Sequence, residues 1–389
     1  MMRKFLQSSK PFYVGVFFLI TFEFLLNFLT MPYPGSQKLD SIKLAYFLHH
    51  HKFYFELFSL LWIAIGGYSL FKGKQRLILL DCLTICVAVY IYTSHLYTAE
   101  RRFPAGENPS FQSVHLSTID KSEMVMTIGD TASSKAFPLP MVMFHHQILD
   151  TFLNRAILVT YCPICQTGRV YEPYINGVYT KFRLVGVNRG NAMFEDERTK
   201  SWWSQETGEC IAGELKSSCL KSIPTKTLTM EKAIAIYPNI QILQPDLAFQ
   251  GKYQNRDFYD GKFANENIIS TKSNWNPKAF VIGIKHDGLQ KAYDWNNLRT
   301  KRLINDSIGI QKVLLCVSMD KKSFVVYENN SNDDAVMIQD TIQINDHSYD
   351  FSGREINGKG PNLKPIEAYR EYWFSWRYAN KNTIQYQVP

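Results

Sequence analysis

The residues of this chain whose type and spacing best suit a chemical role are two cysteines, three positions apart. They are Cys162 and Cys165, in the segment Tyr161-Cys-Pro-Ile-Cys-Gln-Thr-Gly168. This spacing lets two thiols point at one centre, as in the turns that hold zinc or iron. The sequence contains no second Cys-x-x-Cys segment, so a four-cysteine zinc site is excluded. We therefore expect a soft metal, copper(I) or zinc, with further ligands from outside the turn.

Histidine or methionine would complete such a site. His145 is the leading third ligand and Met193 is a further candidate, while His146 and His115 are weaker ones. A set of two thiolates with an imidazole or a thioether suits copper(I) or zinc and leaves a position open for another ligand. The predicted metal site is therefore Cys162, Cys165, His145 and Met193.

Two other interpretations of the cysteine pair stay open. In thiol–disulfide oxidoreductases the first cysteine lies at a helix start, which lowers its pKa. Here the residues after Cys165, Gln-Thr-Gly-Arg-Val-Tyr, predict a turn and a strand instead. Outside the cytoplasm the pair could also be a structural disulfide. No haem is expected, because Gln166 stands where covalent haem attachment needs histidine. No nucleotide is expected either, because phosphate-loop and dinucleotide motifs are missing.

The segment that carries the pair is repeated further along the chain. Residues Val125–Glu172 align with Val281–Glu328 at a constant offset of 156 without a gap, and ten aligned pairs are identical. The second copy has Ser318 and Lys321 where the first has the two cysteines. The pair is therefore specific to the first copy and is not required by the shared fold.

The elements around the pair predict an α+β protein. We expect a linker over residues 98–116, a β-rich repeat over 117–250 with the Cys-Pro-x-Cys site, and a second repeat over 276–389 without it. Asn176-Gly177 is a strong hairpin signal. Each repeat is expected to contain one short helix, at Thr229–Tyr237 and at Pro365–Tyr378.

Residues 1–97 form the membrane anchor in this interpretation. Three apolar runs, Pro11–Thr30, Phe53–Phe71 and Leu77–Tyr97, are each long enough to cross a bilayer as a helix. Glu23, near the middle of the first run, is a candidate for a buried polar contact with a neighbouring helix.

Basic residues set the expected orientation. Arg3, Lys4 and Lys10 precede the first span, and Lys72, Lys74 and Arg76 fill the turn between the second and third. Basic residues favour the cytoplasmic side, so residues 98–389 are expected on the extracytoplasmic (periplasmic) side of the inner membrane. The expected partners are the lipid bilayer and other subunits of a membrane complex. No nucleic acid is expected, since the formal charge of +8 lacks a clustered basic face or a reading module.

The motifs resemble those of the bacterial domain-of-unknown-function family 3179. Its pattern pairs a Tyr-Cys-Pro-x-Cys-x-Thr segment with a Trp-Ser-Gln-x-Thr-Gly segment, which match Tyr161–Thr167 and Trp203–Gly208. An upstream His-x-x-x-x-Asp is similar to His145–Asp150, and an aspartate before the second segment resembles Asp196. The family usually has Gly where this chain has Gln166. The resemblance runs from about Ser117 to the C-terminus and implies an extracytoplasmic setting without an assigned activity.

The sequence thus predicts a membrane-anchored extracytoplasmic protein with a metal-binding Cys-Pro-x-Cys site. One alternative is a non-catalytic accessory subunit of a membrane complex, in which the cysteine pair is structural. The other is a thiol–disulfide oxidoreductase. Whether the protein is an enzyme is left open by the residues.

Overall fold

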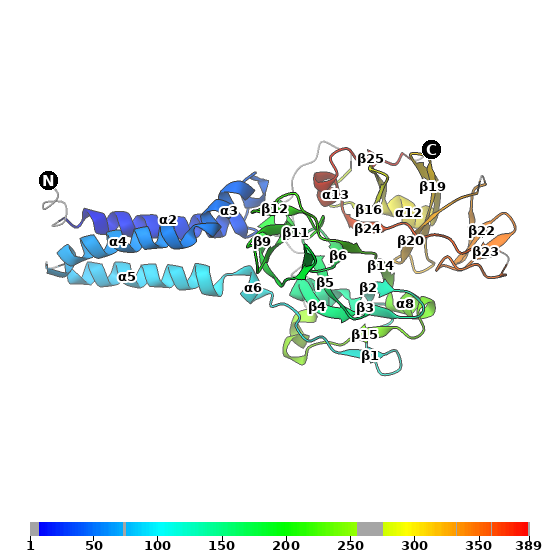
Figure 1. Ribbon diagram of the computed structural model, residues 1–389, viewed down its shortest axis with the longest axis horizontal. Helices are drawn as coiled ribbons and strands as arrows, with labels where there is room; N and C mark the ends of the chain where they lie inside the picture. The colour runs from blue at the N-terminus through cyan, green and yellow to red at the C-terminus, as the bar shows by residue number, and fades with distance from the viewer. Residues whose placement is uncertain (1–7, 73–74, 255–274, 332, 359, 388–389) are drawn as a thin grey trace.

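The computed structural model describes residues 8–72, 75–254, 275–331, 333–358 and 360–387. The molecule is elongated, with a rod of three long helices at one end and a β-rich body at the other (Figure 1). Arg3, Lys4 and Lys74, which carry part of the orientation argument, lie outside the described residues.

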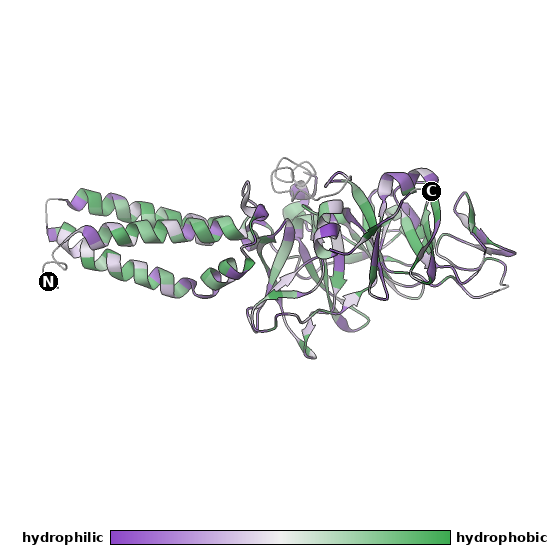
Figure 2. Cartoon of the chain, turned by 90° about the horizontal axis from the view of Figure 1, so that it is seen from above, coloured by the Kyte–Doolittle hydropathy of each residue, from purple (hydrophilic) through white to green (hydrophobic). Residues whose placement is uncertain are grey.

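Three helices long and apolar enough to cross a membrane form the rod, as predicted. They are α2 (Lys10–Thr30), α4 (Lys52–Lys72) and α5 (Arg76–Ile91), which continues into a π-helical turn, η2 (Tyr92–Leu96). Most of their residues are hydrophobic, with polar residues interspersed (Figure 2). Glycine lets two of them approach closely: a Cβ on Gly66 would lie 2.1 Å from the Phe12 backbone nitrogen.

The rod packs directly on the β-rich body. The connection from α2 to α4 contains η1 (Ser36–Lys38) and α3 (Ile42–His50), and α6 (Ala99–Arg102) follows η2. A Cβ on Gly186 of the body would lie 2.1 Å from the Thr30 carbonyl oxygen at the end of α2. His49 Nε2 of α3 lies 3.2 Å from Glu195 Oε2, so the histidine tract is partly used to join the anchor to the body.

The first β-rich unit contains three main sheets. One has the order β1-β15-β3-β2-β14, the second β13-β6-β5-β4 and the third β12-β11-β10-β9. Their strands are β1 (Phe111–Ser113), β2 (Met124–Gly129), β3 (Ser134–Pro138), β4 (Gln147–Phe152), β5 (Arg155–Cys162), β6 (Thr167–Tyr171), β9 (Phe182–Asn188), β10 (Asn191–Asp196), β11 (Trp202–Ser204), β12 (Cys210–Ala212), β13 (Ser222–Ile223), β14 (Lys226–Thr229) and β15 (Gln241–Leu243). The helices are α7 (Leu139–His145), α8 (Met230–Ile236) and α9 (Gln250–Tyr253), preceded by η3 (Leu247–Phe249). The Asn176-Gly177 turn joins the short pair β7 (Tyr174–Ile175) and β8 (Val178–Tyr179).

The second unit also consists mainly of sheets. Its sheets have the orders β24-β16-β17-β25, β18-β19-β20 and β21-β22-β23. The strands are β16 (Phe280–His286), β17 (Leu289–Asp294), β18 (Leu303–Ile308), β19 (Gln311–Val317), β20 (Phe324–Glu328), β21 (Val336–Ile338), β22 (Thr341–Ile344), β23 (His347–Tyr349), β24 (Ala368–Tyr372) and β25 (Ile384–Gln385). The helices are α12 (Trp295–Lys301) and α13 (Trp373–Ala379).

Two helix predictions have different outcomes. Thr229 caps α8 by accepting a hydrogen bond from the Lys232 N–H, as its position before the helix suggested. The helix expected over Pro365–Tyr378 begins only at Trp373, because residues Ala368–Tyr372 pair with β16 as a strand. The predicted linker is also more structured than expected, since β1 pairs with β15.

Candidate functional site

The cysteine pair lies in the turn between two antiparallel strands. The pairing of β5 with β6 runs up to Cys162 and Thr167, and Cys165 belongs to the turn that they close. This hairpin brings the two Sγ atoms to 2.9 Å from each other. Cys162 is 1% exposed and Cys165 is 0% exposed, so the pair lies in the interior.

Both thiols contact the backbone of a neighbouring hairpin. The Gly190 carbonyl oxygen lies 3.4 Å from Cys162 Sγ and 3.2 Å from Cys165 Sγ and accepts from both. Asn191 Nδ2 donates to Cys165 Sγ at 3.3 Å. The turn between β9 and β10 thus supplies an acceptor and a donor to the pair.

The two cysteines differ in their electrostatic surroundings. Burial raises the pKa of Cys162, but hydrogen bonds from the Cys165 thiol and from the N–H groups of Cys165, Ala192 and Ile164 outweigh it and hold that pKa below its ordinary value. Burial raises the pKa of Cys165 well above its ordinary value, and the neighbouring Cys162 raises it further. The arrangement therefore makes Cys162 the more acidic of the two thiols.

Gln166 adopts the left-handed conformation that the usual glycine would take without strain. Its φ is 56°. Its side chain compensates with two hydrogen bonds, because Nε2 donates to the Pro163 carbonyl at 2.7 Å and Oε1 accepts from the Tyr161 hydroxyl at 3.2 Å. The departure at Gln166 thus leaves the turn tight and adds contacts within it.

The Trp-Ser-Gln-Glu-Thr-Gly segment meets the cysteine turn. Gln205 Nε2 donates to Thr160 Oγ1 at 3.0 Å and to the Thr167 carbonyl at 3.2 Å. Gln205 Oε1 accepts from Asn191 Nδ2 at 3.1 Å, the same nitrogen that contacts Cys165. The two sequence motifs are therefore neighbours, joined by one asparagine that belongs to neither.

A buried charged cluster adjoins the two motifs and extends into the second unit. Arg169 donates to Glu371 Oε1 at 2.7 Å, and their side chains are 5% and 0% exposed. Ser375 Oγ lies 2.9 Å from Glu206 Oε2 and 2.8 Å from Glu371 Oε2, so it sits between the two carboxyl groups. Burial raises the pKa of Glu206 well above its ordinary value, and Glu371 raises it further. Sequence reasoning missed this cluster, although Glu206 stands inside a motif.

The raised pKa of Glu206 predicts how stability depends on pH. Below the ordinary glutamate pKa of about 4.3 the group is protonated in both states, and above it only the unfolded chain ionises, so stability falls as pH rises toward the folded pKa. Glu206→Gln should remove this slope. The free energy of unfolding of Glu206→Gln minus that of the unaltered protein should increase from pH 4 upward, and Glu197→Gln on the surface is the control. An equal slope in both variants would contradict the prediction.

The structure does not bring the predicted third ligands to the thiols. His145 Nδ1 lies 2.6 Å from the Pro104 carbonyl oxygen and Nε2 lies 2.8 Å from the Tyr253 hydroxyl, so both ring nitrogens are used elsewhere. Met193 faces the other side of its strand: Ala192 and Phe194 pack with the cysteines, whereas Met193 packs with residues of α2. His146 is buried against Phe103, and His115 is exposed.

Among the residues that the structure describes, no group of three or more His, Cys, Asp or Glu side chains is arranged to hold a metal ion. Cys210 and Cys219 are free thiols, one buried and one exposed. Asp196 accepts from the Trp203 indole N–H at 3.0 Å and organises the loop before the Trp segment.

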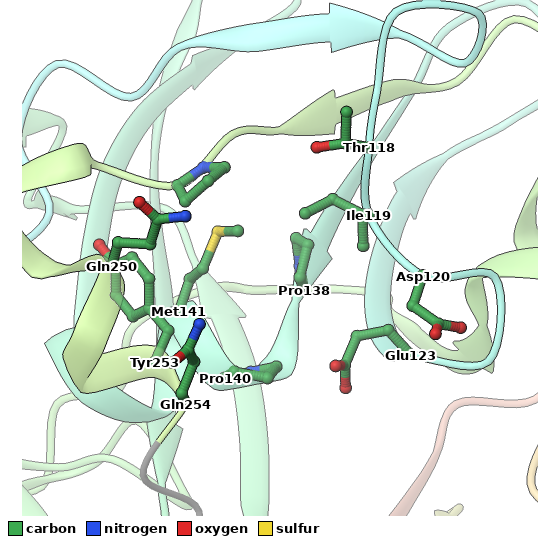
Figure 3. Close-up of a pocket in the computed structure, with 11 residues that line it drawn as sticks. Thr118, Ile119, Asp120, Glu123, Pro138, Pro140, Met141, Gln250, Tyr253 and Gln254 are labelled. Carbon is green, nitrogen blue, oxygen red and sulfur yellow. The ribbon is translucent and has the colours of Figure 1, made fainter.

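His145 contacts instead a residue that lines a separate cavity. The cavity has a volume of about 370 Å³, and Tyr253, the partner of His145, lines it together with Met141 and Pro140 (Figure 3). Asp120 and Glu123 lie on the opposite side. Asp120 already accepts from the Ser122 N–H at 2.6 Å, which orders its own loop.

A larger cavity of about 1100 Å³ lies between the two β-rich units. Lys226 and Lys232 line it, but Lys226 bonds the Tyr237 hydroxyl at 3.1 Å and Lys232 pairs with Asp340 at 2.6 Å. Its lysines are therefore used in contacts between elements, and the cysteine turn remains the candidate site.

The chain belongs to the family described as protein of unknown function (DUF3179), whose model matches residues 100–383. This confirms the resemblance drawn from the motifs. Neither a curated protein nor a solved structure matches the chain. The family gives no activity, so a function has to be argued from the geometry.

Proposed function

We propose that this protein is a membrane-anchored extracytoplasmic protein in which Cys162 and Cys165 form a buried dithiol–disulfide couple. The disulfide would stabilise the place where the anchor and the two β-rich units meet. The observation that carries the proposal is the 2.9 Å separation of the two Sγ atoms in a fully covered turn. Closing the disulfide joins the sulfurs and releases two protons and two electrons, which a protein disulfide of the compartment would accept by exchange during folding, before the turn is covered. A thiolate that attacks another molecule must be accessible to it, so a covered pair suits a structural disulfide better than a catalytic one.

Three parts of the molecule meet at the pair. Gln37 Oε1, in the anchor, accepts from the Gly190 N–H at 3.3 Å. The Cys165 carbonyl accepts from the Tyr372 N–H of the second unit at 3.0 Å. Phe374 packs in the same apolar cluster as both cysteines. Fixing this turn would therefore hold the anchor and both units together, which suits the accessory subunit of a membrane complex.

Differential thiol labelling tests the proposal. Membranes would be quenched with acid, denatured and alkylated, then reduced and alkylated with a second reagent of different mass. We expect Cys162 and Cys165 to take the second label. Cys316, buried and far from another cysteine in sequence, is the internal control and should take the first label. If both cysteines of the pair take the first label, the disulfide brace is refuted.

A second candidate is a soft-metal site made by the two thiolates alone. The lowered pKa of Cys162 and the 2.9 Å separation of the two sulfurs support copper(I), which accepts soft thiolate ligands. His145 and Met193 take no part in this version. Copper content of the purified, reduced full chain tests it: the unaltered protein should bind about one ion per chain, and a Cys162→Ser, Cys165→Ser variant should lose it. Full copper content in the variant would refute this candidate.

The location outside the cytoplasm is part of the proposal. Lys72 and Arg76 flank the tight turn between the second and third spans, and basic residues favour the cytoplasmic side. A reporter that is active only in the cytoplasm should be silent when fused after Pro389. A strong signal from that fusion would contradict both the orientation and the oxidising setting that the disulfide requires.

We also propose that the two β-rich units arose by duplication. The offset of 156 that aligns the sequences also carries α7, Leu139–His145, onto α12, Trp295–Lys301. The aligned pairs Lys135–Asp150 and Lys291–Asp306 form ion pairs of 2.6 and 2.5 Å. On this basis the second unit shows what the fold needs without the cysteines, and the pair is an addition to the first unit.

A further inference from the structure

We infer that Glu23 and Glu56 form a carboxyl pair that binds one proton at the junction of the membrane helices and the outer body. The carboxyl group of Glu23 is 1% exposed. Glu56 of α4 shares a cation with it, since Lys52 Nζ lies within 3.5 Å of an oxygen of each carboxyl group. Among the described residues, Glu23 Oε1 has no hydrogen-bond partner, and the contact of Glu56 Oε1 is the ion pair with Lys52. Two carboxyl oxygens in this position are stable together when one of them carries a proton.

The other oxygen of Glu23 is fully occupied. Glu23 Oε2 accepts from Thr93 Oγ1 at 2.7 Å and from Ser94 Oγ at 3.1 Å, both in η2. Lys52 Nζ lies 3.4 Å from the same oxygen and 3.5 Å from Glu56 Oε1. These contacts fix the carboxyl group, and its buried Oε1 has no hydrogen-bond partner among the described residues.

The charges around the pair are balanced when one proton is bound. Lys52 supplies one positive charge against the two carboxylates, so the group carries one excess negative charge unless a proton is bound. The remaining charged groups are paired elsewhere: Arg183 of β9 binds Glu195 at 2.7 Å, and His49 of α3 lies 3.2 Å from the same carboxylate. An uncompensated charge inside a helix bundle is costly, and one shared proton removes it.

A cavity gives the pair a route to the outer surface. It has a volume of about 160 Å³, and Glu23, Lys52 and Ser94 line its inner end. Glu100 of α6 and Arg183 line it as well, and their side chains are 56% and 40% exposed. Polar side chains line it from Glu23 to Glu100, which suits water and the passage of a proton from the outer side.

Infrared titration of the full chain in lipid nanodiscs tests the inference. At neutral pH we expect the carbonyl stretch of one protonated carboxyl group, lost when either Glu23→Gln or Glu56→Gln leaves a single carboxylate paired with Lys52. Spectra are taken as differences from the unaltered protein, so the contribution of Glu206 cancels. Asp81→Asn, which removes an exposed acid of α5, is the matched control and should leave the band unchanged.

Three results would overturn the inference. The first is a Glu56→Gln variant with the full band. The second is a band that sodium chloride removes at constant pH while choline chloride does not, which would make the ligand a metal cation. The third is an unchanged midpoint pH of the band in Lys52→Met, a variant that keeps both acids. We expect this variant to raise the midpoint, since the cation that favours ionisation is gone. An unchanged midpoint would mean that Lys52 does not act on the pair.

Discussion

Replacing Arg169 with methionine is expected to destabilise the outer part of the chain by about 3–5 kcal/mol, the usual result of removing one partner of a buried ion pair. The guanidinium group pairs with Glu371, donates to the Glu206 carbonyl at 3.0 Å and to Thr167 Oγ1 at 2.6 Å, and lies over the Tyr369 ring. Methionine fills similar space but makes none of these bonds. Glu371 would then be buried beside Glu206 without a cation.

A matched surface pair supplies the control for Arg169. Arg155 lies 2.7 Å from Glu172, but its side chain is 60% exposed and Lys221 also pairs with that glutamate. Arg155→Met should therefore cost only about 0–1 kcal/mol. Urea unfolding of the full chain in detergent, followed by tryptophan fluorescence, measures both. Equal effects in the two variants would mean that the buried cluster contributes no more than a surface contact.

A double variant shows whether the loss of stability in Arg169→Met comes from the unpaired charge of Glu371. Adding Glu371→Gln to Arg169→Met removes the carboxylate that lost its cation. The double variant should be more stable than Arg169→Met alone, because the interaction between the two sites is not additive. A double variant that is less stable still would show that packing, not charge, dominates at this junction.

Local patterns predicted much of the fold, because they depend on neighbours in sequence. The three apolar runs, the turn at Asn176-Gly177 and the cap at Thr229 all rest on contacts within a few residues. The error at Pro365–Tyr378 has a different origin. Its first part pairs as a strand with β16, 84 to 92 positions earlier, and such pairing overrides local helix signals.

The candidate site was only half predictable for the same reason. Cys162 and Cys165 can be recognised in the sequence by their spacing, and the hairpin brings them together. The partners of His145 lie 41 and 108 positions away, and Glu371 lies 202 positions from Arg169. No periodicity in one sequence records these contacts. Asn191, which joins the two motifs, carries no motif signal of its own.

Gly190→Ala is expected to be one of the most damaging single-methyl changes near the cysteine pair. Gly190 has φ of 82°, a conformation that costs an alanine about 1–2 kcal/mol. Its Cβ would also lie 2.9 Å from the Phe374 ring, which is 1% exposed and cannot move aside freely. Crowding of this kind adds about 1–3 kcal/mol. Any shift of the turn also moves the carbonyl oxygen that both thiols contact.

Gly177→Ala separates the two contributions to the Gly190 effect. Gly177 has a similar φ of 78°, but nothing lies within 4 Å of a Cβ placed there, so its variant carries the backbone cost alone. The difference in unfolding free energy between the two variants should be about 1–3 kcal/mol and reports the contact with Phe374. Gly190→Ala should also let alkylating reagents reach Cys162 and Cys165 in the folded, reduced chain, whereas Gly177→Ala should not. If the two variants are equally stable and equally protected, α13 does not cover the cysteine turn in the way that we describe.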